Sequence, residues 1–205
     1  MIKIFTTLIA LTISVISFGQ KSRTSDQIRN DLNLAKFSKP IKLIKTIFFS
    51  NPSIKDTVIL TVDTGLIYKS KSHITIKTFE NRTVFYETFS TVFFSRGVFY
   101  PDTIPQGNQA IYDKFLDNYM KSVSKTKIEN FTLLKINSFL NDIVVNKSEL
   151  KEFKDIATDK QLYNRVMNDK NSLVIWLPIF ESDEGVRYFT YSSTKKAAIK
   201  FLETD

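Results

Sequence analysis

The residue types that usually carry acid–base or nucleophilic catalysis are scarce in this chain. It has one histidine, His73, and no cysteine. A serine or cysteine nucleophile needs a neighbouring base, which is usually an imidazole. In HITIKTF (73–79) apolar and polar side chains alternate, which places His73 on the polar face with Thr75 and Lys77. We therefore expect an exposed strand histidine and no catalytic triad, and we expect no zinc site built from histidine and cysteine ligands.

Carboxylates are the remaining groups that can do acid–base work. Glu181, Asp183 and Glu184 cluster in one segment, but their spacing lacks the ligand density and the ordered glycine of an EF-hand loop. We expect a solvated acidic turn there. A glycosidase needs two opposed carboxylates in a cleft, and the sequence alone places no such pair. Hydrolysis of an envelope polysaccharide by paired carboxylates stays open as an alternative function.

The five glycines lie far apart, so none of them builds a phosphate-cradling loop or a dinucleotide-binding fingerprint. We expect no nucleotide and no other cofactor.

The stretch VFYETFSTVFFSRGVFYP (84–101) is the most aromatic part of the chain. Phe93 and Phe94 are adjacent, so an extended chain would point them to opposite sides. The residues after them are rich in turn formers, which places the last two rings on a loop beside an arginine. Such residues are typical of binding interfaces, although the rings can instead fold back over an open edge of the core. The predicted partner-binding residues are Arg96, Phe99 and Tyr100.

The chain carries a formal net charge of +8, which favours encounters with anionic partners. The lysines form separate small clusters, such as KPIKLIK (39–45), and no aromatic residues are interleaved with them. We therefore do not expect nucleic acid as the partner. We expect an acidic protein or an envelope component, and the oligomeric state stays open.

The first residues, MIKIFTTLIALTISVISFGQ, have the three-part pattern of a secretory signal peptide. Lys3 precedes a short apolar run, and Ser17 and Gly19 occupy the −3 and −1 positions of a cleavage site before Gln20. The run is shorter than the ~20 residues that span a bilayer. We predict a signal peptide over 1–19, a single domain over 20–205 without a membrane span, and a secreted or periplasmic location.

Hydrophobic periodicity predicts an α+β fold, with antiparallel β-meanders at both ends of the mature chain and a helical segment between them. SLVIWLPIF (172–180) is continuously apolar and is predicted to be a central strand buried on both faces. Strands are predicted at 57–63, 73–79, 84–89, 172–180, 186–192 and 197–203, the last with a helix as the alternative. Helices are predicted at 24–34, 111–123, 133–143 and 148–156, and a further helix begins with the capping box Thr158–Gln161. The segment 41–49 fits a strand or a short helix equally well.

Three segments resemble small exported proteins and lipoproteins of Bacteroidota-type bacteria. These are SHITIKTFENRTVFYETF (72–89), Tyr191–Lys196 after a strand, and the Phe-Gly pair before Gln20. The resemblance covers about a third of the chain, and it implies an exported protein with a β-meander but no particular activity. The chain departs from the lipoproteins because it lacks their cysteine.

Together these features favour a non-catalytic exported protein that binds another macromolecule. One specific version is an immunity or inhibitor protein that neutralises a secreted toxin. The alternatives are the carboxylate-based polysaccharide hydrolase and a binder of anionic polymers such as lipopolysaccharide or nucleic acid, which would need the lysine clusters to merge into one patch.

We predict that the exported protein begins at Gln20, because the small residues before it fit the cleavage site of signal peptidase. Intact-mass measurement and N-terminal sequencing of protein from the extracytoplasmic fraction check this. A full-length chain that stays in the cytosol would contradict both the cleavage site and the location.

Overall fold

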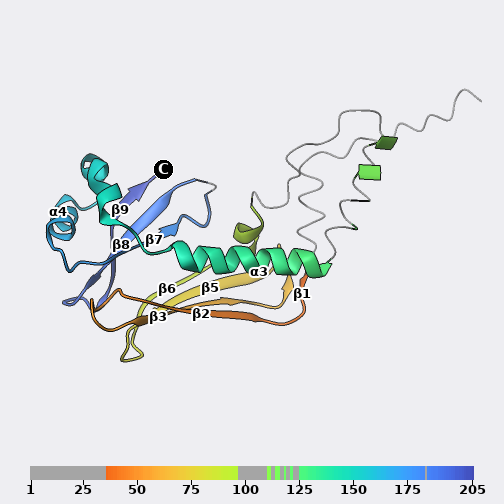
Figure 1. Cartoon of the computed structure of the whole chain (residues 1–205), viewed down its shortest axis with the longest axis horizontal. Helices are drawn as coiled ribbons and strands as arrows, with labels where there is room; N and C mark the ends of the chain where they lie inside the picture. The colour runs from red at the N-terminus through yellow and green to blue at the C-terminus, as the bar shows by residue number, and fades with distance from the viewer. Residues whose placement is uncertain are drawn as a thin grey trace, which may run out of the picture.

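The computed structural model describes residues 36–96, 110–111, 114–115, 118, 121, 125–182 and 184–205. The fold is α+β, as expected, with antiparallel strands at both ends of the described chain and helices between them (Figure 1). The predicted signal peptide and the predicted helix at 24–34 lie outside the described residues. The described residues of 110–121 are helical, in agreement with the predicted helix there.

The first sheet is a four-stranded antiparallel meander in the order β2-β3-β5-β6. A separate two-stranded ribbon pairs β1 with β4. The segment that fitted strand or helix equally well is the edge strand β2. The bounds are β1 Lys36–Phe37, β2 Ile41–Ile47, β3 Asp56–Val62, β4 Gly65–Leu66, β5 Lys71–Lys77 and β6 Thr83–Ser90.

The two faces of this sheet differ as the alternation predicts. Leu60 and Ile74 lie opposite one another on the inner face, and both are fully buried. His73 and Tyr86 lie on the outer face, where Tyr86 is exposed. The predicted polar face of β5 is therefore confirmed.

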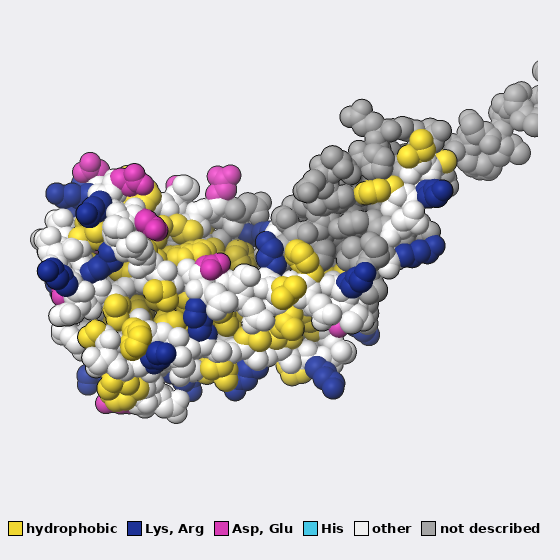
Figure 2. All heavy atoms as spheres, in the orientation of Figure 1, with side chains coloured by type: hydrophobic (Ala, Val, Ile, Leu, Met, Phe, Trp, Pro, Cys, Tyr) yellow, Lys and Arg dark blue, Asp and Glu magenta, His cyan; other side chains and the backbone are white. Residues whose placement is uncertain are grey.

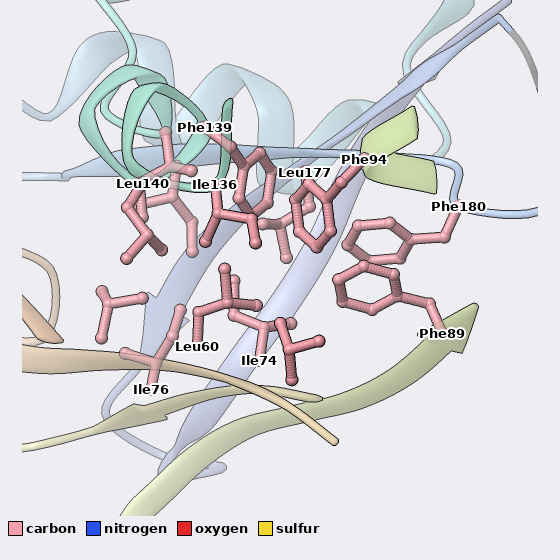
Figure 3. Close-up of a cluster of buried hydrophobic side chains, with 14 of the residues drawn as sticks. Leu60, Ile74, Ile76, Phe89, Phe94, Ile136, Phe139, Leu140, Leu177 and Phe180 are labelled. Carbon is pink, nitrogen blue, oxygen red and sulfur yellow. The ribbon is translucent and has the colours of Figure 1, made fainter. Parts of the chain in front are cut away.

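Helix α3 (Lys125–Asp142) lies across the inner face of the first sheet (Figure 1). Its residues Ile136 and Leu140 point toward Leu60 and Ile74 (Figure 3). Burial of each such side chain stabilises the fold by about 1.5–3 kcal/mol. Among the described residues, no helix combines the length and the apolar character that a bilayer crossing requires.

The second sheet has the order β7-β8-β9, with β7 Val174–Pro178, β8 Val186–Ser192 and β9 Ala197–Thr204. The predicted third strand at 197–203 is confirmed. The central position predicted for 172–180 is wrong, because β7 lies at an edge of this sheet. The predicted burial on both faces is confirmed: Ile175 packs in the core shared with the first sheet, whereas Val174 packs in a second core.

The open edge of β7 is covered by the segment that follows α3. Val144 forms an antiparallel bridge with Ile175, and the backbone N–H of Trp176 donates to the carbonyl of Ile143 at 2.9 Å. These bonds satisfy backbone groups of an edge strand that would otherwise be buried without partners.

The second core lies between the second sheet and two helices, the 3₁₀ helix η2 (Lys147–Ile156) and α4 (Lys160–Asn168). The hydroxyl of Tyr163 in α4 donates to the carbonyl of Leu150 in η2 at 2.5 Å. The predicted start of α4 is wrong by one residue. Asp159 and not Thr158 caps the helix, because the Asp159 carboxylate accepts from the backbone N–H of Leu162 at 2.8 Å.

The aromatic stretch builds a phenylalanine cluster where the two sheets and α3 meet. Residues Thr91–Ser95 form the 3₁₀ helix η1 instead of continuing the strand, so the opposite directions predicted for Phe93 and Phe94 are wrong. In a 3₁₀ helix neighbouring side chains are not forced to opposite sides as they are in a strand. The ring centroids of Phe93 and Phe94 lie 5.3 Å apart, and both rings belong to the same cluster. Phe89 and Phe180 stack with centroids 3.6 Å apart (Figure 3). The cluster consists of Phe89, Phe93, Phe94, Phe139 and Phe180.

A half-buried ion pair joins the sheets beside this cluster. Arg187 of β8 donates through Nη2 to both carboxylate oxygens of Glu87 of β6, at 2.8 and 3.0 Å, and to the carbonyl of Pro178 at 2.8 Å. The guanidinium lies 5.6 Å from the ring centroid of Phe180. An arginine held by a carboxylate, a carbonyl and a ring fixes how the second sheet sits on the first.

We expect Phe180→Ala to lower the free energy of unfolding by about 3–5 kcal/mol, because it leaves a cavity among four other rings. Phe79→Ala is the matched control: Phe79 is 53% exposed whereas Phe180 is 2% exposed. The control should change stability by less than about 0.5 kcal/mol. Denaturant unfolding of both variants measures this, and equal losses would show that the phenylalanine cluster does not hold the fold together.

Candidate functional site

Of the three predicted partner-binding residues, the structure describes Arg96, while Phe99 and Tyr100 lie outside the described residues. Arg96 follows η1, and its Nη1 donates to the carbonyl of Ser182 in the turn after β7 at 2.6 Å. The structure thus places Arg96 at the border of a cavity between η1, α3 and β7.

This cavity, the cationic cavity below, has a volume of about 300 Å³. Its wall on the α3 side is one helix face, because the residues there follow the three-and-four spacing of a helical stripe. Its floor is the edge of the phenylalanine cluster. The lining residues are Phe93, Phe94, Arg96, Lys135, Ser138, Phe139, Asp142, Trp176 and Ser182.

Trp176 stands at the end of the cationic cavity and is held in place by α3. Its indole N–H donates to the carbonyl of Asp142 at 2.5 Å. Lys45, from β2, donates to the neighbouring carbonyl of Asn141 at 2.8 Å. The last carbonyls of a helix have no partners within the helix, so these two bonds cap α3 and fix the indole at the same time.

A second cavity of about 420 Å³, the acidic cavity, lies on the other side between η2 and the second sheet. Asp142 and Trp176 line both cavities, so the two cavities are neighbours, and together we call them the Trp176 groove. Figure 2 shows hydrophobic side chains in a hollow on this face and acidic side chains around it. The acidic cavity is lined by Asp142, Val144, Val145, Glu149, Leu150, Glu152, Phe153, Trp176, Val186 and Tyr188.

The two ends of the Trp176 groove carry opposite charges. Arg96 and Lys135 line the cationic cavity, whereas Glu149 and Glu152 line the acidic one. Burial raises the pKa of Tyr188 above its usual value; the negative charge of Glu149 adds to this, and a hydrogen bond with Thr204 opposes it. The groove therefore combines fixed rings with a gradient of charge, an arrangement suited to binding.

The single histidine does take part in a polar network, on the outer face of the first sheet. His73 Nε2 lies 3.3 Å from Asp63 Oδ2, and Nδ1 lies 2.9 Å from the Thr88 hydroxyl and 3.1 Å from the Tyr86 hydroxyl. An Asp, a His and a Thr in contact are the parts of a nucleophilic triad, which the alternation alone did not predict. Acyl transfer also needs donors placed for an oxyanion, so these contacts by themselves do not make a catalytic site.

The acidic turn predicted at 181–185 connects β7 with β8, and Asp183 lies outside the described residues. Within the part of the chain that the structure describes, no group of three or more His, Cys, Asp or Glu residues is arranged to hold a metal ion. Asp142, Glu149 and Glu152 line the groove but are exposed to solvent. The general acid of a glycosidase needs apolar surroundings that raise its pKa.

The sequence patterns did not point to Trp176, Lys135 or Tyr188 as site residues. Trp176 was assigned to a strand buried on both faces, although its side chain is only partly buried. One signal was available: Trp176 is the only tryptophan of the chain. Tryptophan is enriched among the residues that contribute most to binding energy at protein interfaces. Lys135 carried no signal, because its place in the lining of the same cavity as Arg96 depends on how α3 packs.

We expect Glu149→Gln to lower the pKa of Tyr188 toward the usual value of about 10, because it removes a negative charge beside the phenol. Glu152→Gln, in the same cavity, should leave that pKa unchanged. Alkaline absorbance titration of each variant against its Tyr188→Phe counterpart isolates this one phenol. Equal shifts in both variants would contradict the described placement of Glu149.

No family model, no curated protein and no solved structure matches this chain. Inferences about its function therefore depend on its own residues and their geometry.

Proposed function

We propose that this is an exported, non-catalytic binding protein that holds a segment of a partner polypeptide in the Trp176 groove. The observation that carries the proposal is an indole fixed by the end of α3 between two cavities of opposite charge. The leader-like N-terminus supports export, and the scarcity of groups for acid–base catalysis supports a binding role.

The composition of the groove favours a polypeptide as the ligand. Protein interfaces are enriched in aromatic residues and arginine, and their strongest contacts come from Trp, Tyr and Arg. The groove offers Trp176, Tyr188 and Arg96 for such contacts. Val144 adds apolar area at the surface, because 52% of it is exposed.

A rigid groove also lowers the cost of binding. The indole N–H is already bonded to Asp142, and Phe94 and Phe139 belong to the buried phenylalanine cluster. Side chains that are ordered before binding lose little conformational entropy on binding. An immunity or inhibitor protein that neutralises a toxin is one specific form of this function, since such a protein only has to bind tightly.

The binder of anionic polymers is less well supported. Lys42 and Lys45 belong to the same sequence cluster, but in strand β2 they lie on opposite faces. Lys45 is moreover bonded to the end of α3. This cluster therefore does not form one basic patch.

We expect Val144→Lys to weaken capture of the partner at least about tenfold, because it places a charge on the apolar border of the groove. Ile44→Lys is the matched control: Ile44 is an exposed β-branched residue on the outer face of the first sheet, 60% exposed against 52% for Val144. Both variants add the same charge, so only the site differs.

The measurement uses the tagged mature protein to capture material from the envelope and medium of its own source, with quantitative mass spectrometry of what is bound. A partner that Ile44→Lys retains and Val144→Lys loses supports the proposal. Equal retention by both variants, or equal loss, would exclude the groove as the binding site. Thermal unfolding of both variants checks that each is folded.

A further inference from the structure

Resting on the proposed function, we infer that the acidic cavity receives the side chain of a lysine or arginine residue of the partner segment. The walls of this cavity are largely apolar and aromatic, and the charged side chains among its described lining residues are all carboxylates. The apolar walls make it a docking surface, and the charges at its border decide which side chain fits.

The wall on the side of the second sheet is aromatic. Trp176 of β7 and Tyr188 of β8 are paired directly across the two strands, so their side chains stand next to each other on one face of the sheet. The bond from the indole N–H to the Asp142 carbonyl fixes the first ring. The face of an aromatic ring attracts a cation that lies within about 6 Å of its centre.

The opposite wall is the helix η2, whose sequence sorts its charges by side. In ELKEFKDI (149–156) acidic, apolar and basic residues repeat every three positions. A 3₁₀ helix has three residues per turn, so residues three apart lie one above the other. Glu149 and Glu152 therefore share the side that lines the cavity, whereas the two lysines of the repeat lie on another side and are not among the described lining residues.

The carboxylates at the cavity are available to a ligand. Glu149 and Glu152 are exposed, and neither forms an ion pair within the part of the chain that the structure describes. Burial raises the pKa of Tyr188, and the negative charge of Glu149 raises it further, which agrees with a carboxylate close to the aromatic wall. Asp142 adds a third carboxylate from the end of α3.

The apolar surface of the cavity favours a long side chain over a free ion. The volume of about 420 Å³ is within the range of ligand sites. Val144, Phe153 and Val186 offer apolar surface to the aliphatic stem of a lysine or arginine, while its charged head reaches the exposed carboxylates. The net charge of +8 does not prevent this contact, because salt at physiological strength screens charges beyond about 8 Å.

The test uses Trp176 as a reporter, because it is the only tryptophan of the chain. Its fluorescence is followed during titration with N-acetyl-Leu-Arg-Leu-amide and with the citrulline analogue, in which a neutral urea of the same shape replaces the guanidinium. We expect the arginine peptide to bind at least about threefold more tightly at low salt, because only it can pair with the carboxylates. The corresponding lysine peptide should show the same preference over its Nε-acetylated form.

The variants assign this preference to the acidic cavity. Glu149→Gln combined with Glu152→Gln should abolish it, because the charges that face the ligand are then lost. Glu181→Gln combined with Glu184→Gln is the matched control, which makes the same change of charge in the exposed turn after β7 and should keep the preference. Neither control residue is in the described lining of the cavity. Thermal unfolding checks that both double variants are folded.

Equal affinities for the charged and neutral peptides would overturn the inference, as would the absence of saturable binding up to about 10 mM. A preference that survives the change at Glu149 and Glu152, or that is lost in the control as well, has the same consequence. Calcium chloride and tetramethylammonium chloride are titrated in the same way. Saturation by either at a lower concentration than by the arginine peptide shows a site for a free cation and also overturns the inference.

The outcome for the proposed function is separate. If these titrations fail while Val144→Lys still loses the captured partner and Ile44→Lys keeps it, the proposed function stands. Only the assignment of a basic side chain to the acidic cavity then falls.

Discussion

The stack of Phe89 on Phe180 is the contact on which the rest of this structure depends. It joins β6 of the first sheet to the turn after β7, with ring centroids 3.6 Å apart. Phe93, Phe94 and Phe139 complete the cluster, so η1 and α3 are fixed to the same point. A chain without cysteine has no disulfides to do this, and large rings supply the buried area instead.

The Trp176 groove is a consequence of that cluster. Once η1, α3 and the turn after β7 are packed together, the outer edges of the rings form the floor of the cationic cavity. The end of α3 then meets β7, and its free carbonyl at Asp142 holds the indole of Trp176. The site is therefore as rigid as the core below it, which suits tight binding without rearrangement.

In the proposed function, the distribution of charge separates the encounter with a partner from its recognition. The chain is strongly basic overall, yet Glu149 and Glu152 gather at one end of the groove and Lys135 and Arg96 at the other. Long-range attraction depends on the net charge, whereas selectivity depends on the local arrangement.

The sequence by itself determined the class of fold and most strands, because alternation along β3 and β5 and the spacing of Ile136 and Leu140 are local patterns that a strand or a helix must satisfy. It also suggested Arg96 as a partner-binding residue, which stays a prediction. Only the tertiary structure decided that β7 is an edge strand, that η1 turns Phe93 and Phe94 together, and that Lys135 and Trp176 line the same cavity as Arg96. These outcomes depend on contacts between residues far apart in the chain, which no local periodicity encodes.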